Sequence, residues 1–147
     1  MKEKLEEYAL SKSVQKANTT VKVGIVGCGS MGQEIAILVS KAGIDVNFVE
    51  ISQKLVDKAL AGMASMIDDI ISHWGMTSGD KRAILSRIQG STEYSILEGS
   101  TIVIESINTA KWIPNQPVRK EVFQNIERVV CPNCVIASNA STVVIGD

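Results

Sequence analysis

The stretch that decides the fold is VKVGIVGCGSMG, which runs from Val21 to Gly32. Its first half, up to Val26, is a run of β-favouring apolar residues, which is typical of a strand buried on both faces of a parallel sheet. Its second half, from Gly27, has the pattern G-x-G-x-x-G. Glycines at these positions permit a tight turn, a close approach of phosphate to backbone and close packing of the next helix. The stretch therefore predicts a strand, a phosphate-binding loop and a helix N-terminus that attracts anions.

An acidic residue follows at the spacing that dinucleotide binding requires. Residues 46–49 are predicted to form a second strand, and Glu50 follows it, about 20 residues beyond the middle glycine of the loop, Gly29. A carboxylate there accepts hydrogen bonds from the hydroxyls of the adenosine ribose and repels a 2′-phosphate. The sequence thus predicts NAD rather than NADP as the cofactor. The alternative is an ordinary strand-to-helix turn with a solvated strand end.

The rest of the chain alternates between helical and strand patterns. Apolar residues recur at helical spacing in four segments, 31–41, 53–74, 80–88 and 118–130. Further β-rich runs occupy residues 89–92, 101–105 and 135–138. Strands that alternate with helices imply right-handed crossovers and a mainly parallel sheet with helices on both faces. We therefore predict an α/β fold, a Rossmann-type doubly wound domain over 21–147 with a helical hairpin insertion, preceded by an extension over 1–20.

Composition and charge exclude several classes of protein. The chain has 15 Lys and Arg residues against 16 Asp and Glu residues, a net charge of -1. Because no long run has a single sign, we expect no broad basic face for nucleic acid. No apolar stretch approaches the roughly 20 residues of a membrane span, and the start has no apolar run of the signal-peptide kind. We expect a cytoplasmic protein that binds neither nucleic acid nor membrane.

The cysteines and the single histidine do not form a recognisable metal or redox site. Cys131 and Cys134 make a C-x-x-C pair, but a structural zinc site uses such a pair twice, and a redox pair usually begins a helix. The odd count of three cysteines argues against a disulfide framework. We expect Cys28 to be a small packing residue and His73 to be exposed or to serve packing. No metal is predicted.

Three strings resemble the NAD-binding domain of the 3-hydroxyacyl-CoA dehydrogenases, including the 3-hydroxybutyryl-CoA type. GCGSMGQEIA at 27–36 is similar to the family's opening loop, and IVIES at 102–106 is similar to the end of its fourth strand. ASNAST at 137–142 is similar to the Ser-Asn-Thr-Ser that follows its fifth strand. The helical hairpin matches an insertion that sets this family apart from plainer dinucleotide-binding domains. The resemblance covers the chain from about Val21 onward.

The loop motif and the resemblance together imply a set of site residues. The implied cofactor-binding residues are Gly27, Gly29, Ser30, Met31, Gly32, Glu50, Ile107, Asn108, Thr109, Arg119 and Ser141. Among them, the Met31 backbone is expected on the pyrophosphate, Glu50 on the adenosine ribose and 107–109 beside the nicotinamide. Ser141 is also the implied catalytic residue, since in the family this serine assists a His/Glu pair that takes up the hydroxyl proton. A turn or capping serine is the alternative for this position.

The sequence departs from the family in two places. After IVIES the family has a second Glu and then a Lys, whereas this chain has Asn108 and Thr109, and Arg119 becomes the counterpart of the Lys after several extra residues. The family's catalytic His and Glu lie beyond the fifth-strand string, and this chain stops at Asp147. We therefore expect the 147 residues to bind NAD but not to turn over substrate by themselves, the family's C-terminal helical domain being absent.

These observations predict the NAD-binding domain of a 3-hydroxyacyl-CoA dehydrogenase-like oxidoreductase of fatty acid metabolism. Such an enzyme transfers a hydride between a 3-hydroxyacyl-CoA and NAD, so the implied substrate is an acyl-CoA. A homodimer is expected only with the helical domain. Two alternatives stay open. One is another β-hydroxyacid dehydrogenase, in which G-x-G-x-M-G also occurs, and the other is a non-catalytic NAD-binding or structural module, which the missing second Glu favours.

Overall fold

The structure, a computed structural model, describes residues 20–107 and 116–141 and contains a single parallel sheet in that part of the chain. Its strands are β1 (Lys22–Val26), β2 (Asp45–Val49), β3 (Ile88–Ser91), β4 (Ile102–Glu105) and β5 (Val135–Ser138). They lie in the order β3-β2-β1-β4-β5, and each neighbouring pair is parallel. The chain therefore runs outward from β1 in both directions, and the order reverses between β1 and β4, where ligands of such sheets bind.

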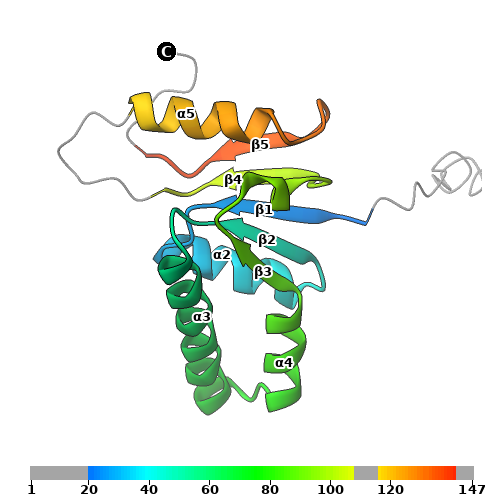
Figure 1. The fold of residues 1–147 in the computed structure, drawn as a ribbon. Helices are drawn as coiled ribbons and strands as arrows, with labels where there is room; N and C mark the ends of the chain where they lie inside the picture. The colour runs from blue at the N-terminus through cyan, green and yellow to red at the C-terminus, as the bar shows by residue number, and fades with distance from the viewer. Residues whose placement is uncertain (1–19, 108–115, 142–147) are drawn as a thin grey trace, which may run out of the picture.

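Helices cover both faces of the sheet (Figure 1). One face carries α2 (Ser30–Lys41), α3 (Gln53–Trp74) and α4 (Ser78–Ser86). The other carries α5 (Gln116–Glu127) and a short 3-10 helix, η2 (Tyr94–Leu97). This arrangement confirms the predicted doubly wound α/β fold, with α3 and α4 as the helical hairpin.

The sheet divides the hydrophobic core into two clusters. Successive residues of a strand point to opposite faces, so Ile25 packs in the larger cluster under α2 and α3, whereas Val26 packs in the smaller one under α5. Phe48 is fully buried in the larger cluster and Leu97 in the smaller. Each such side chain contributes about 1.5–3 kcal/mol when it leaves water. The carboxyl ends of the strands are thereby fixed from both sides.

Several predicted boundaries were wrong by one to three residues, and the two helices α4 and α5 show the largest differences. Helix α4 begins at Ser78, because the Thr77 side chain and Asp80 form a capping box at its N-terminus. It ends at Ser86 rather than at 88, because Ile88 pairs with Val46 and starts β3. Helix α5 ends at Glu127 rather than at 130. The connection between β3 and β4 contains the short helix η2, which no predicted segment covered and whose residues Tyr94, Ile96 and Leu97 pack in the smaller core cluster.

Several expectations fall outside the described residues. These are the extension at 1–19 and the predicted cofactor contacts of Asn108 and Thr109. In the part of the chain that is described, no helix is both long enough and apolar enough to cross a membrane.

Candidate functional site

The glycine loop lies at the centre of the edge where the five strands end. Directly after β1, Gly27 turns the chain at a φ of +86°, a conformation that strains any residue with a Cβ. A Cβ on Gly27 would also lie 2.8 Å from the backbone of Ile107, at the end of β4. This position therefore requires glycine for its conformation and for the close approach of two strand ends.

The other two glycines of the motif have different surroundings. A Cβ on Gly32 would lie 2.5 Å from the carbonyl oxygen of Gly27, so a side chain there would push α2 away from the loop. A Cβ on Gly29 would meet nothing within 4 Å. Gly29 is the N-cap residue of α2, and the first N–H groups of a helix have no acceptor within the helix. The open space in front of Gly29 thus faces donors that suit a phosphate.

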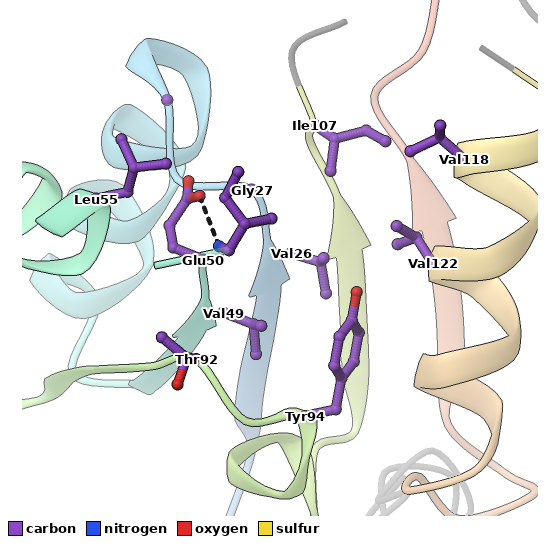
Figure 2. A pocket seen from close by; sticks show the side chains of 12 residues that line it. Val26, Gly27, Val49, Glu50, Leu55, Thr92, Tyr94, Ile107, Val118 and Val122 are labelled. Atoms are coloured by element: carbon purple, nitrogen blue, oxygen red, sulfur yellow. Dashed lines mark hydrogen bonds between the residues drawn. The ribbon is translucent and has the colours of Figure 1, made fainter. Parts of the chain in front are cut away.

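Glu50 extends from the end of β2 toward this loop (Figure 2). The backbone N–H of Cys28 donates to Glu50 Oε1 at 2.6 Å, and the N–H of Ile51 donates to Oε2 at 3.3 Å. The N–H of Gly27 donates to the carbonyl of Val49 at 3.0 Å. The carboxylate is thus held beside the glycine loop, where the ribose of a bound dinucleotide was predicted to lie.

A pocket of about 390 Å³ opens beside Glu50, between the strand ends and α5 (Figure 2). Its lining is mostly apolar and consists of Val26, Gly27, Gly29, Val49, Glu50, Ile51, Leu55, Thr92, Tyr94, Ile107, Val118 and Val122. Apolar walls suit a flat aromatic base, and the single carboxylate suits the hydroxyls of a sugar. The pocket, which we call the adenosine pocket, has the chemistry that an adenosine requires.

A second pocket adjoins the first at the glycine loop. It has a volume of about 300 Å³ and is lined by Gly29, Ser30, Met31, Glu34, Ser106, Ile107 and Asn139. Gly29 and Ile107 line both pockets, so the phosphate-binding loop lies between them. A dinucleotide has its pyrophosphate between two nucleoside halves. We call the second space the nicotinamide pocket, after the half of the dinucleotide that the sequence predicts beside Ile107.

The structure brings most of the predicted site residues together. Gly27, Gly29, Ser30, Met31, Glu50 and Ile107 line one or both pockets. Gly32 lies behind the loop and allows α2 to pack against it. Ser141 is exposed and follows two residues after Asn139 of the nicotinamide pocket, so its contact with cofactor or substrate stays a prediction.

Arg119 lies behind the site rather than on its surface. Its Nη1 donates to both carboxylate oxygens of Glu105, at 2.7 and 2.6 Å. Glu105 is 0% exposed and Arg119 is 8% exposed, and neither residue belongs to the lining of the two pockets described above. The structure thus gives Arg119 a partner within the protein, and its predicted contact with the cofactor stays a prediction.

Sequence reasoning missed several pocket residues that the topology supplies. Thr92 and Tyr94 follow β3, and Val118 and Val122 belong to α5. These segments are far apart along the chain and meet only because β3 lies next to β2 and α5 lies over β4. The position of Thr92 at the end of a predicted strand was the one signal that the sequence offered for them.

The remaining reactive groups do not form a further centre. Burial, followed by the nearby charge of Glu50, raises the pKa of the Cys28 thiol to about 12, and the side chain is buried as expected. His73 is exposed in the last turn of α3. Among the residues that the structure describes, no group of three or more His, Cys, Asp or Glu side chains could hold a metal ion.

Comparisons with known proteins agree with this geometry. The sequence profile of the family described as "3-hydroxyacyl-CoA dehydrogenase, NAD binding domain" matches residues 22–147. A 3-hydroxybutyryl-CoA dehydrogenase of Mycobacterium tuberculosis is 28% identical over 123 residues, which are 83% of this chain and 41% of that protein. A peroxisomal fatty acid beta-oxidation multifunctional protein of Arabidopsis thaliana is 30% identical over 122 residues, 83% of this chain and 16% of that protein.

A solved structure shows the same likeness in three dimensions. The (S)-3-hydroxybutyryl-CoA dehydrogenase of Ralstonia eutropha superposes with a TM-score of 0.76 and 37% identity. The match covers 84% of this chain and 42% of that one. This chain therefore spans less than half the length of the relatives that it matches.

Proposed function

The chain belongs to the family of NAD-binding domains of 3-hydroxyacyl-CoA dehydrogenases, and on this premise we propose that it provides the NAD site for oxidation and reduction of a 3-hydroxyacyl-CoA. The chemistry that bound NAD would supply is reversible hydride transfer with the C3 carbon of such a substrate. The observation that carries the proposal is the open glycine loop between two pockets, with Glu50 beside it.

The adenosine pocket fits one half of NAD. Its volume of about 390 Å³ lies within the range of roughly 300–1,000 Å³ that is usual for ligand sites. The base would pack between Tyr94, Leu55 and the apolar face of α5, and the ribose hydroxyls would donate to Glu50. A 2′-phosphate would bring a second negative charge against this carboxylate. We therefore propose that the site prefers NAD to NADP.

The pyrophosphate fits the open space before Gly29. No side chain blocks the approach of phosphate to the backbone there. The N–H groups of Ser30 and Met31, in the first turn of α2, would donate to the phosphate oxygens, and the positive end of the helix dipole would favour their charge.

The reaction itself needs a proton acceptor, and neither the implied catalytic serine nor the histidine is suited to that role. Ser141, just beyond the nicotinamide pocket, would hydrogen-bond the reacting oxygen but is too weak a base to take its proton at neutral pH. His73 is the one histidine of the chain. It lies near the end of α3, about 30 Å along the helix from the end that adjoins Glu50. We therefore propose that the 147 residues bind NAD without turning over substrate.

Binding and turnover measurements test the two parts of the proposal separately. Calorimetry on this chain should show NADH binding at least about tenfold, or 1.4 kcal/mol, more tightly than NADPH. Oxidation of NADH by a short 3-ketoacyl-CoA should be absent with this chain and present with the product of the full open reading frame. Equal binding of the two cofactors would contradict the role of Glu50. A full product that binds NADH without turnover would favour the non-catalytic module.

Two further expectations stay predictions. Cell fractionation would check the cytoplasmic location, and sedimentation of this chain beside the full open-reading-frame product would check whether a homodimer requires additional residues.

A further inference from the structure

A buried carboxylate joins the segments that border the nicotinamide pocket. Glu105, the last residue of β4, is 0% exposed. Its Oε1 accepts the backbone N–H of Ile107 at 2.8 Å, and both of its carboxylate oxygens accept Nη1 of Arg119. Its Oε2 also accepts the hydroxyl of Ser138 at 2.6 Å. The end of β4, helix α5 and the end of β5 therefore meet at one charged group.

The network extends into the loop that follows β5. The Ser138 hydroxyl donates to Glu105 and accepts the N–H of Ala140 at 3.1 Å. The N–H of Asn139 donates to the Glu105 carbonyl at 2.8 Å. Ser138, the last residue of β5, is thus attached to the Glu105 carboxylate, and Asn139, the next residue, is attached to the Glu105 backbone.

The residues held in this way form walls of the nicotinamide pocket, whereas Glu105 lines neither pocket. Ile107 and Asn139 both line the nicotinamide pocket. Arg119 Nη2 approaches the carbonyl of Ile107 at 3.5 Å, so the same ion pair also reaches the segment after β4. Asn139 is absent from the lining of the adenosine pocket. Loss of the Ser138 hydroxyl would therefore loosen one pocket and leave the other.

Stability alone does not account for such a group. Burying two charges has a desolvation cost that often cancels their attraction, so an apolar replacement of similar volume is commonly as stable. A fully hydrogen-bonded buried network does, however, fix the positions of the segments that it joins. The role that these contacts leave for Glu105 is to fix the position of the loop of Asn139 relative to the end of β4.

We propose that Glu105, acting through Ser138 and Arg119, is a positioning residue for the nicotinamide half of NAD. The inference rests on the proposed NAD site, and it assigns to this buried network the placement of the pocket walls after β4 and β5. Glu105 touches neither cofactor nor substrate. Its effect reaches the nicotinamide through Ile107 and Asn139.

The test compares two ligands that share the adenosine half. NADH has a nicotinamide nucleoside, and ADP-ribose lacks the nicotinamide. Ser138→Ala should weaken NADH binding about tenfold and change ADP-ribose binding less than about twofold, as measured by calorimetry. Glu105→Gln should weaken NADH binding at least as strongly and ADP-ribose binding less, because the Ile107 that Glu105 holds also lines the adenosine pocket. A general loss of structure would weaken both ligands equally. Exchange of the Asn139 and Ala140 amide hydrogens should also accelerate in both variants.

Ser40→Ala provides a matched control. Ser40 is buried, and its hydroxyl donates to the Ile84 carbonyl at 2.7 Å, on the α4 side of the sheet. This variant also loses one hydrogen bond that a serine hydroxyl donates inside the protein, and it should leave both affinities unchanged. If Glu105→Gln fails to fold, Ser138→Ala decides the matter, because it retains the ion pair with Arg119.

The outcomes separate the inference from the NAD site itself. If the unmodified chain binds neither NADH nor ADP-ribose, the proposed site fails. If it binds both but Ser138→Ala reduces both affinities equally, or neither, only the positioning role is overturned. Equal affinity of the unmodified chain for the two ligands would likewise overturn that role.

Discussion

The backbone N–H of Cys28 donates a 2.6 Å hydrogen bond to Oε1 of Glu50, across 22 positions of sequence. This bond joins the glycine loop after β1 to the first residue after β2. It places a carboxylate within the loop's own hydrogen-bonding system, beside the space in which a ribose would lie. The ribose hydroxyls would then donate to an acceptor that is already oriented.

Replacing Glu50 by glutamine tests the charge of this acceptor. Glu50→Gln keeps the shape and one acceptor oxygen but removes the negative charge that opposes a 2′-phosphate. We expect NADH binding to weaken about tenfold and the preference for NADH over NADPH to shrink, both measured by calorimetry. Asp69→Asn, which removes an exposed carboxylate from the late part of α3, is the control and should change neither. An unchanged cofactor preference in Glu50→Gln would show that another group sets it.

Gly29 and Gly32 should separate binding from folding. A Cβ on Gly29 meets no protein atom within 4 Å, so Gly29→Val should melt within about 2 °C of the original chain while losing NADH binding, because the side chain fills the phosphate space. A Cβ on Gly32 would lie 2.5 Å from the Gly27 carbonyl oxygen. Gly32→Ala should therefore lower the free energy of unfolding by about 1–3 kcal/mol in urea titrations. Undiminished NADH binding by Gly29→Val would mean that the loop holds no phosphate.

The Cys28 thiol should resist alkylation although it lies in the loop. Burial and then the charge of Glu50 raise its pKa to about 12, so at pH 8 the thiol stays almost entirely protonated. Iodoacetamide should label the exposed Cys131 first and Cys28 only after unfolding or at much higher pH. Peptide mass spectrometry of the native and urea-unfolded chain measures this order. Rapid labelling of native Cys28 at pH 8 would show that the loop opens in solution.

The capping box of α4 makes a pH-dependent contribution to stability. Hydrogen bonds from the backbone and then the side chain of Thr77 hold the pKa of Asp80 below its ordinary value of 3.8. Because the folded pKa is the lower one, this contribution is present above the unfolded value and is lost as the pH falls through the folded value. Thr77→Ala should lower the melting temperature at pH 7 by roughly 4 °C, with a smaller difference at pH 2.

Scanning calorimetry at the two pH values checks this prediction. Ser72→Ala, which removes an exposed hydroxyl near the end of α3, is the control at both. The same loss for Thr77→Ala at pH 7 and pH 2 would show that the Asp80 carboxylate contributes nothing to the cap.

Local sequence spacing was sufficient to predict which residues meet at the glycine loop. Gly27, Gly29 and Glu50 belong to one strand-loop-helix-strand unit, and their placement follows from the geometry of that unit. The apolar periodicity likewise predicted the five strands of the described residues and the hairpin of α3 and α4. These features depend on residues that are close together along the chain, and the spacing of residue types in the sequence records such local relations.

The walls of the site depend on strand order, which local patterns do not encode. Tyr94 and Val122 line the same pocket only because β3 and β4 lie on opposite sides of the β2 and β1 pair. The partner of Arg119 was also missed. Its position was matched to a cofactor-binding lysine, whereas its guanidinium pairs with Glu105, 14 residues earlier. A long side chain can turn inward or outward from the same backbone position, and the sequence does not decide which.

The adenosine pocket draws its walls from both halves of the molecule. Leu55 belongs to α3, which packs in the larger core cluster, and Val122 packs in the smaller cluster on the other side of the sheet. A molecule in this pocket would therefore contact residues on both faces of the sheet and would connect the two core clusters directly. At a ligand concentration one hundred times the dissociation constant, binding would add about 2.7 kcal/mol to the free energy of unfolding. Both core clusters would be stabilised together.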